Sequence, residues 1–225
     1  MMQDAAGSVF SVIAAKAGIQ NCESPAIRHL GLTEYLPAYE AMRRFTDSRG
    51  TATTDELWVL EHPPVYTVGL GGRSEHFPKS SEIPLERIDR GGQSTYHGPG
   101  QAIVYALVDL ARRTLTVRAM VAHMEQAVID VLAARGVHAA RTPGAPGVYV
   151  EGAKIAALGL RVRRGCCYHG VALNVAMDLA PFSAIDPCGY PGLAVTQTSA
   201  LGIAGSAVEL GGELASRIAR LIQRA

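Results

Sequence analysis

The segment Pro146–Pro191, which reads PGVYVEGAKIAALGLRVRRGCCYHGVALNVAMDLAPFSAIDPCGYP, decides the fold of this 225-residue chain. Two glycine-containing pairs, Glu151-Gly152 and Arg164-Gly165, divide its first part into three apolar runs. Glycine-containing pairs between strand-like runs are typical of β-hairpin turns. The segment therefore predicts an antiparallel meander followed by a loop over residues 178–195. The three strands of the meander are expected at residues 148–150, 153–163 and 166–177.

Helical and strand-like patterns also occur on both sides of the meander. Further strands are predicted at residues 27–30, 57–61, 65–68 and 103–110, and helices at 34–48, 117–135 and 213–223. Thr33 and Thr116 are the expected N-caps of the first two helices, which Gly50 and Gly136 are expected to end. Hairpin strands combined with separate long helices favour an α+β fold with a mainly antiparallel sheet.

The chain is predicted to form one domain over residues 27–225, preceded by a poorly ordered extension, residues 1–26. Its length fits a single unit, and an apolar content of 48% permits a sizeable core. The extension contains the apolar run Val9–Ala15 but has no arginine and no basic segment ahead of that run. It therefore lacks the pattern of a secretory signal or a transit peptide.

Charge and cysteine content narrow the classes of function. A formal net charge of +1 disfavours general binding to nucleic acid or to an anionic membrane. No apolar run approaches the ~20 residues of a membrane span. The four cysteines form no C-x-x-C pair, which indicates a reducing, cytoplasmic setting. The seven histidines show no metal-ligand spacing, so neither a metal nor another cofactor is expected.

Two side chains of the opening segment are candidates for nucleophilic chemistry. Cys188 stands in the turn Asp186–Pro191, where proline and glycine fix the direction of a side chain; the alternative is a small buried hydrophobic residue. Lys154 interrupts an apolar strand, and regular alternation places it on one face with Ala156 and Leu158. The alternative is an edge-strand lysine whose amine reaches solvent. A thiol near a buried amine is a nucleophile at neutral pH, because a cation stabilises the reactive thiolate.

A polar loop rich in glycine, Arg90–His97 (RGGQSTYH), precedes a buried strand. It has neither the G-K-[ST] of a Walker loop nor G-x-G-x-x-G spacing, so a ligand-binding loop and a structural connection both stay open. Gly69–Arg73 (GLGGR) is a candidate anion nest. His62 and His169 are expected to be structural histidines.

Basic residues gather at the predicted turn between the second and third strands of the meander. Arg163 and Arg164 are adjacent, and Arg161 lies two positions earlier. This group either faces an acidic protein partner or forms a solvated hairpin tip.

Five stretches resemble the lipoyl(octanoyl) transferases, the octanoyltransferases of lipoate biosynthesis. In family order they are EHPPVYTVGLGGR (61–73), RGGQSTYHGPGQ (90–101), APGVYVEGAKIAALGLRVRRGC (145–166), HGVALNVAMDL (169–179) and DPCGYPG (186–192). The patterns RGG-x-x-TYHGPGQ, GVYV-x-x-x-KI-x-x-LG and PCGY are specific. The resemblance extends from about Ile27 to the C-terminal helix. It implies a biotin/lipoate protein ligase-like fold, in which a smaller sheet lies beside the main one.

The resemblance also implies a reaction and its partners. An octanoyl group would pass from octanoyl-acyl carrier protein to a lysine of a lipoyl domain, in 2-oxoacid dehydrogenase acyltransferase subunits or in the glycine-cleavage H protein. Cys188 matches the cysteine that carries the acyl thioester, and Lys154 matches the lysine that lowers the pKa of that thiol and transfers protons. The residues that match the family's substrate-binding segments are Arg90, Gly91, Gly92, Gln93, Ser94, Thr95, Tyr96, His97, Ala157, Leu158, Gly159, Gly170, Val171 and Ala172. His97 and backbone N–H groups near Leu158-Gly159 are the expected donors to the tetrahedral oxyanion.

Three rival functions stay open on the sequence alone. An ATP-dependent lipoate or biotin ligase of the same fold would form an acyl-adenylate and would need no cysteine, so Cys188 disfavours it. An octanoyl amidotransferase would share the acyl chemistry but place its cysteine elsewhere. A non-catalytic module that binds acyl carrier protein or lipoyl domains would need neither Cys188 nor Lys154.

Overall fold

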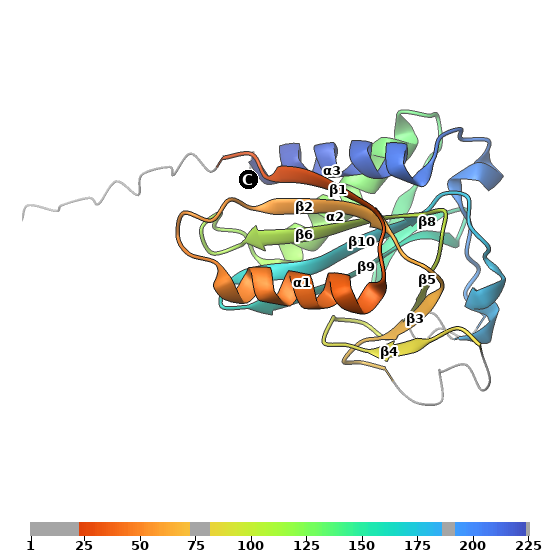
Figure 1. Cartoon of the computed structure of the whole chain (residues 1–225). Coiled ribbons are helices and arrows are strands. Elements are labelled where there is room, and N and C mark those ends of the chain that lie inside the picture. The colour runs from red at the N-terminus through yellow and green to blue at the C-terminus, as the bar shows by residue number, and fades with distance from the viewer. Residues whose placement is uncertain (1–22, 73–81, 186–191, 224–225) are drawn as a thin grey trace, which may run out of the picture.

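The structure is a computed structural model that describes residues 23–72, 82–185 and 192–223 (Figure 1). The strands are β1 (Ala26–Leu32), β2 (Glu56–Glu61), β3 (Val65–Val68), β4 (Leu85–Arg87), β5 (Ser94–His97), β6 (Gln101–Asp109), β7 (Ala140–Thr142), β8 (Ala145–Val150), β9 (Ala153–Arg163) and β10 (Cys166–Asn174). The helices are α1 (Tyr35–Ser48), α2 (Val117–Ala133) and α3 (Ala207–Gln223), with two 3-10 turns, η2 (Ala180–Ala184) and η4 (Thr198–Leu201). No helix in this described part of the chain is long and apolar enough to cross a membrane.

The strands form two sheets of different size. The larger sheet has seven strands in the order β1-β2-β6-β10-β9-β8-β7, and the smaller has three in the order β4-β3-β5. Neighbouring strands are antiparallel except β1–β2 and β3–β4, which are parallel. The predicted α+β class, with a mainly antiparallel sheet and a smaller second sheet, is confirmed.

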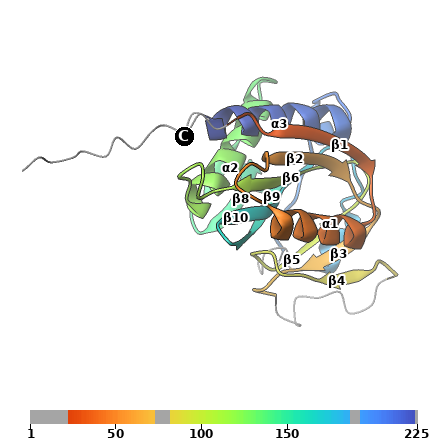
Figure 2. The same ribbon diagram turned by 60° about the vertical axis from the view of Figure 1, so that its left-hand side comes forward.

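Helices cover both faces of the large sheet (Figures 1 and 2). On one face, α2 and α3 pack around fully buried side chains such as Val104, Met124 and Leu214. On the other face, α1 packs Met42 into a smaller cluster with Trp58. Each such side chain contributes about 1.5–3 kcal/mol when it leaves water. The small sheet lies near the N-terminal end of α1, and the space between the two sheets is where the main cavity forms.

The predicted meander is confirmed as strands β8, β9 and β10. The register pairs β8 with β9 and β9 with β10 in antiparallel fashion. Glu151-Gly152 and Arg164-Gly165 have φ values of 50° and 84°, and 51° and 78°. Positive φ at both central residues is the signature of type I′ hairpin turns, whose twist matches that of the strands.

The ends of the helices only partly follow the sequence prediction. Thr116 caps α2 as expected, because its hydroxyl accepts from the N–H of Ala119 at 3.1 Å. Thr33 does not cap α1, since its hydroxyl donates to the carbonyl oxygen of Leu30 and α1 begins after Glu34. Helix α3 begins at Ala207, earlier than the predicted Glu213.

A capping box starts α3 and was missed in the sequence. Ser206 Oγ accepts from the N–H of Glu209 at 3.2 Å, and the carboxylate of Glu209 accepts from the N–H of Ser206 at 2.8 Å. Gly211 lies inside this helix, although glycine weakens helices. The fold needs glycine there, because a Cβ would lie 2.7 Å from Cγ1 of Val59 on the sheet below.

Two of the three strands of the second sheet, β4 and β5, were not predicted as strands, whereas β3 was. Residues 94–97, placed in a polar loop by the sequence, pair as β5 with β3, and residues 85–87 pair with the other edge of β3. At the start of the chain, β1 begins at Ala26, and Arg113 donates to the carbonyl oxygen of Glu23 at 2.7 Å. The last residues of the predicted extension thus contact the domain, and the rest of it, residues 1–22, lies outside the described residues.

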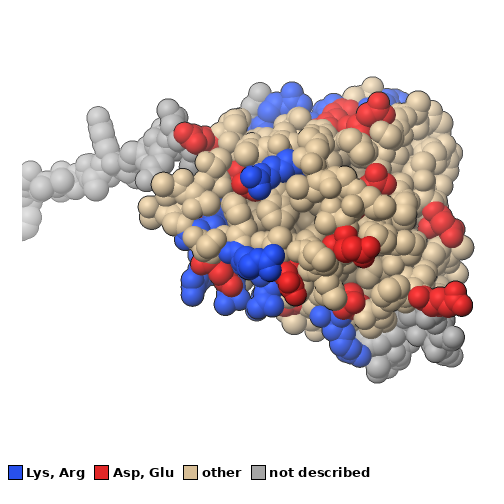
Figure 3. Space-filling model, viewed as in Figure 1, with Lys and Arg blue, Asp and Glu red and all other residues tan. Residues whose placement is uncertain are grey.

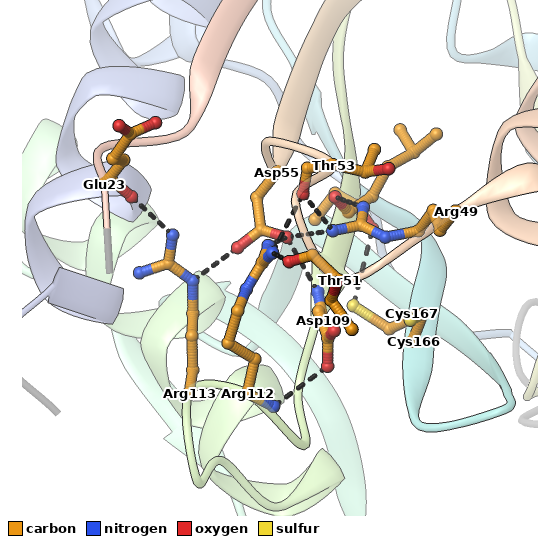
Figure 4. Close-up of polar contacts among 12 residues, drawn as sticks. Glu23, Arg49, Thr51, Thr53, Asp55, Asp109, Arg112, Arg113, Cys166 and Cys167 are labelled. Carbon is orange, nitrogen blue, oxygen red and sulfur yellow. Dashed lines mark hydrogen bonds and ion pairs between the residues drawn. The ribbon is translucent and has the colours of Figure 1, made fainter. Parts of the chain in front are cut away.

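One buried carboxylate ties several distant segments together (Figure 4). Asp55, at the start of β2, accepts hydrogen bonds from Arg49, Arg112 and Arg113. Arg49 follows α1, and Arg113 also donates to the carbonyl oxygen of Ile222 at 3.4 Å near the end of α3. Asp55 therefore joins the end of α1, the turn after β6 and the C-terminal helix at one point.

Candidate functional site

The main cavity is a space of about 500 Å³, partly open to solvent, between α1, the small sheet and strands β6, β9 and β10. It is lined by Tyr35, Arg90, Gly92, Gln93, Ser94, Thr95, His97, Ile103, Tyr105, Ala157, Leu158, Gly159, His169, Gly170, Val171 and Ala172. The structure thus brings together all the predicted substrate-binding residues except two. Gly91 instead donates its N–H to Leu160 at 3.0 Å, and Tyr96 packs against Tyr66 and Phe182.

Small residues make the floor of the cavity flat and apolar. Register places Ala172 beside Ile103 on β6 and Ala157 on β9, and places Gly170 beside Tyr105 and Gly159. These residues form two rows across β6, β10 and β9, on the part of the sheet face that α1 does not cover. A Cβ at Gly170 would lie 1.9 Å from the carbonyl oxygen of Val104, so only glycine fits there.

The glycine-rich loop Arg90–Gln93 forms one wall of the cavity and is held by the segment Gly69–Gly72. Gly69 and Leu70 donate backbone N–H groups to the carbonyl oxygens of Gln93 and Arg90. Gly71 donates to Gly92 and Gly72 donates to Gly69. Because these N–H groups are occupied, the candidate anion nest is wrong for residues 69–72, and Arg73 lies outside the described residues.

Arg90 reaches from this loop into the space beneath the small sheet. The residue is 8% exposed, and its guanidinium donates to the carbonyl oxygen of Thr67 at 2.7 Å and to the Thr67 hydroxyl at 2.8 Å. It also donates to the carbonyl oxygen of Gly91 at 3.0 Å. A buried, always charged guanidinium on the wall makes one end of the cavity attractive to an anion or a polarised carbonyl.

A chain of hydrogen bonds connects His97 in the cavity wall to the backbone of Lys154. His97 Nδ1 is 2.7 Å from Gln101 Oε1, and Gln101 Nε2 donates to Asn174 Oδ1 at 2.9 Å. Asn174 donates to the carbonyl oxygen of Thr196 at 2.9 Å, and Thr196 donates its N–H to the carbonyl oxygen of Lys154 at 3.0 Å. Asn174 donates to a backbone carbonyl, so its oxygen accepts from Gln101, and the oxygen of Gln101 faces His97. An amide oxygen can only accept, so the proton of the His97 ring lies on Nδ1.

The protonation of His97 disagrees with one expectation from the sequence. Burial, helped by nearby His62, lowers the pKa of His97 to about 3, so the ring is neutral at pH 7. With the proton on Nδ1, Nε2 has only a lone pair. His97 is therefore built as a hydrogen-bond acceptor and is unsuited to donate to an oxyanion.

Two tyrosines of the cavity, Tyr35 and Tyr105, and the contacts of His62 were not predicted from the sequence. His62 Nδ1 faces the carbonyl oxygen of Thr33 at 2.5 Å, which fixes the proton there, so Nε2 accepts from the hydroxyl of Tyr105 at 2.7 Å. Burial lowers the pKa of His62 to about 4. Tyr35 stacks on the ring of His97 at 6.0 Å. Tyr105 lies in a strand that was expected to be buried, and none of the motifs singled out in the sequence includes Tyr35.

His169 was expected to be a structural core histidine, but it lines the cavity. Its backbone has a φ of 63°, which is unusual in a strand. Its ring lies between Tyr39 and Tyr168, with centroids at 5.6 and 5.0 Å. Burial lowers the pKa of His169, although Asp89, 3.6 Å away, opposes this.

Asp89 joins three elements at the edge of the cavity. Its carboxylate accepts from the hydroxyl groups of Tyr39 on α1 and Tyr168 on β10, and Arg161 on β9 lies 3.7 Å away. Burial raises the pKa of Asp89, but nearby His169 and the hydrogen bonds from Tyr168 and Tyr39 outweigh it and leave the pKa below its usual value. The carboxylate therefore stays charged and fixes the residue before Arg90.

Lys154 is buried, and a β-bulge turns it toward a second cavity. Register pairs Tyr149 with Lys154 but Val148 with Ala156, so Ile155 is an extra residue. Bulges re-aim side chains in this way. The expectation that Lys154 shares a face with Ala156 and Leu158 is therefore wrong.

The second cavity, of about 280 Å³, shares Thr95 and Ala157 with the main one. Lys154 lines it, and its Cε and Nζ lie 2.4 and 3.1 Å from the place that a Cβ on Gly147 would occupy. Nζ also lies 5.4 Å from the ring centroid of Tyr149. The side chain of Lys154 therefore has room only because residue 147 is glycine, and it forms part of the wall of the second cavity.

Cys188 lies outside the described residues, but both flanks of its segment are described. Ile185, before it, is buried with Tyr66 and Phe182. After it, Ala194 accepts the N–H of Lys154 at 2.8 Å, which makes a parallel bridge between Lys154 and Val195. Residues 194–196, which follow Cys188 in the sequence, therefore lie beside Lys154.

Comparisons with known proteins find related sequences over most of the chain. The family profile described as lipoyl protein ligase A/B catalytic domain matches residues 34–202. An octanoyltransferase of Azoarcus sp. strain BH72 is 58% identical over 197 residues, which cover 87% of this chain and 87% of that protein.

Solved structures agree with the fold. A bi-partite lipoate protein ligase from Thermoplasma acidophilum has a TM-score of 0.70 at 18% identity and covers 88% of this chain and 83% of its own. Biotin protein ligase from Aquifex aeolicus has a TM-score of 0.57 at 11% identity and covers 88% of this chain and 71% of its own. At such identities the likeness concerns the fold alone, and it confirms the predicted biotin/lipoate protein ligase-like fold.

Proposed function

The chain belongs to the lipoyl protein ligase A/B catalytic-domain family, among its octanoyltransferases, and we propose that it transfers an octanoyl group from octanoyl-acyl carrier protein to a lysine of a lipoyl domain through a thioester on Cys188. As an octanoyltransferase it is an acyltransferase of lipoate biosynthesis. The observation that carries the finer proposal is the bridge between Lys154 and Val195. It fixes the chain after Cys188 against the only lysine that lines a cavity in the described part of the chain.

The proposed reaction has two acyl transfers and needs no ATP. The thiolate of Cys188 attacks the carbonyl carbon of the octanoyl thioester, and the bond from that carbon to the carrier's sulfur breaks. The departing thiolate takes a proton from the ammonium of Lys154. The reactant and product of this step are both thioesters, so the exchange is nearly isoenergetic.

In the second transfer, the neutral amine of the acceptor lysine attacks the thioester on Cys188. A carbon–nitrogen bond forms, the carbon–sulfur bond breaks, and the thiolate of Cys188 is restored. The attacking nitrogen gives one proton to the amine of Lys154, which becomes an ammonium again. Lys154 thus alternates between acid and base, and its buried position beside Gly147 and Tyr149 supports that role.

The main cavity suits an acyl chain. Its floor is made of Ile103, Ala157 and Ala172, and each methylene of the chain that leaves water there contributes about 0.8 kcal/mol. The polar wall with Arg90 faces the same space. We place the chain on the apolar rows and the thioester end toward Thr95 and Ala157, which both cavities share.

The proposed acceptors are lipoyl domains, of 2-oxoacid dehydrogenase acyltransferase subunits and of the glycine-cleavage H protein. Support comes from the structural neighbour from Thermoplasma acidophilum, which was studied with its E2 lipoyl domain. The proposal requires that transfer to such a domain proceeds without ATP.

Intact-mass measurement tests the covalent step. Mixing the protein with octanoyl-acyl carrier protein should add one octanoyl group to the enzyme, and an apo lipoyl domain should then remove it. Cys188→Ser should abolish the thioester adduct, whereas Cys166→Ser, at a buried cysteine whose pKa burial raises, should keep it. A thioester-type adduct on Cys188→Ser, or transfer that requires ATP and releases pyrophosphate, would contradict the proposal.

A further inference from the structure

Five exposed arginines form one surface beside the cavity, which we call the arginine surface. Arg43 and Arg44 belong to the C-terminal half of α1, and Arg161, Arg163 and Arg164 belong to β9 and the β9–β10 turn. Figure 3 shows blue side chains gathered at the lower left, where Figure 1 places this end of α1 and of the hairpin. The proposed transfer gives these residues no role.

Specific contacts hold the two elements of this surface together. Arg163 pairs with Asp47 of α1 at 3.0 Å, and Arg164 donates to the carbonyl oxygen of Asp47 at 3.4 Å. Arg44 pairs with Glu40 at 3.4 Å. In the described part of the chain these arginines pair with the carboxylates of Glu40, Asp47 and Asp89, so the five guanidinium groups leave the surface with a positive charge.

The arginine surface is continuous with the cavity wall. Arg43 lies over the ring of Tyr39 at 5.6 Å, and the hydroxyl of Tyr39 donates to Asp89. Asp89 also lies near Arg161 and near His169, which lines the cavity. A partner that binds the arginines therefore stands at the edge of the site.

The ion pairs within the surface are weak enough to be exchanged. The side chains of Arg44, Arg161 and Arg163 are 70%, 44% and 42% exposed. Exposed pairs contribute little to stability, because water screens the charges and long side chains lose freedom. An acidic partner can therefore replace the internal carboxylates without disturbing the fold.

We propose that the arginine surface binds the acyl donor, a carrier protein with an acidic face that presents its acyl group on a phosphopantetheine arm. This proposal rests on the proposed function. The arm places a phosphodiester anion between the thioester and the carrier, so the donor must bring negative charge to the edge of the cavity. Charge complementarity of this kind steers encounter and fixes orientation.

The acceptor fits this surface poorly, because it presents a lysine. A separate groove on the other side of Tyr35 carries negative charge. It is lined by Leu36, Pro63 and Pro64 together with Glu34 and Glu86. Its carboxylates disfavour an acidic donor at that side. The distribution of charge around the cavity therefore assigns the donor to the arginine surface.

Steady-state kinetics with two donors test the assignment. Arg163→Gln/Arg164→Gln should raise the KM for octanoyl-acyl carrier protein by about fivefold or more, leave kcat within about twofold, and flatten the salt dependence of the rate. The KM for S-octanoyl-pantetheine, which lacks both phosphate and protein, should not change, nor should the KM for the lipoyl domain. Arg43→Gln/Arg44→Gln provides an independent second variant on α1.

Arg118→Gln/Arg220→Gln is the matched control, because both residues are exposed on helices of the opposite face and the charge change is equal. An unchanged KM for the carrier-protein donor at low ionic strength in both test variants would overturn the proposal. A rise in the lipoyl-domain KM instead would assign the surface to the acceptor. If the wild-type enzyme transfers from neither donor, the proposed function fails, and direct titration of octanoyl-acyl carrier protein into the wild type and the variants still decides the docking surface.

Discussion

Acidification from pH 7 to pH 5 should destabilise this protein through its two buried histidines, His62 and His97. Burial lowers their pKa values from 6.5 to about 4 and about 3. In the unfolded chain both rings bind protons below pH 6.5, whereas in the folded protein they stay neutral until the pH approaches the lowered values. Between these limits the unfolded state binds more protons, so the free energy of unfolding falls as the pH falls.

The expected magnitude follows from the same values. At pH 5 each ring is about 1.5 pH units below its unfolded pKa, which corresponds to about 2 kcal/mol for each histidine and about 4 kcal/mol for the pair. His169, whose pKa burial also lowers, acts in the same direction. Asp89 has a pKa below its usual value, so its contribution is lost only at lower pH, outside this window.

Urea unfolding at pH 7, 6 and 5 measures this effect. With a slope of about 2 kcal/mol/M, a loss of about 4 kcal/mol moves the midpoint down by about 2 M. His97→Asn keeps a donor near Gln101 but removes the titrating ring, so it should reduce the loss between pH 7 and pH 5 by about half, whatever its effect at pH 7. A free energy of unfolding that is the same at pH 7 and pH 5, or an equal loss in wild type and His97→Asn, would refute the reasoning.

Three substitutions test other parts of the structure. Asp55→Ala removes the carboxylate that pairs with three arginines, so their positive charges lose that partner. It should lower the free energy of unfolding by about 3–5 kcal/mol in urea titrations. Gly147→Ala places a methyl group where Lys154 now lies and should reduce kcat for octanoyl transfer by about 100-fold. Gly144→Ala is the control and should keep most of the activity, because Gly144 also has a positive φ, 77°, and a Cβ added there would meet no atom within 4 Å. Ser206→Ala removes the cap of α3 and should cost about 1 kcal/mol of stability at any pH from 6 to 8, and an unchanged urea midpoint would contradict the role of the cap.

The sequence predicted those elements of the fold that depend on residues close together in the chain. The meander, with its I′ turns at Glu151-Gly152 and Arg164-Gly165, and the capped start of α2 at Thr116 all depend on neighbouring residues. The small sheet depends on pairing between distant segments, so β5 looked like part of a loop. The need for glycine at position 211 also depends on a distant segment, because α3 approaches Val59 closely there.

The site was predicted from motifs and not from geometry. Motif resemblance named most of the residues that line the main cavity, including Arg90, Ala157 and Gly170. It missed Tyr35 and Tyr105, because an aromatic residue at an apolar position of a helix or strand carries no mark of its function. Only the contacts of these rings with the neutral histidines distinguish them from core residues.

The bulge at Ile155 explains how a lysine on a strand of the large sheet can line a cavity. Without the extra residue, alternation would leave Lys154 on the face of Ala156 and Leu158, which packs against α2 and α3. The extra residue reverses the side chain while the strand continues unbroken to Arg163. The same backbone of Lys154 bonds to Ala194 and Thr196, and Thr196 bonds in turn to Asn174, so the amine, the return of the chain after Cys188 and the wall of the cavity share one support. A change that straightens β9 should therefore remove the amine from the site and loosen the segment that follows the proposed nucleophile at the same time.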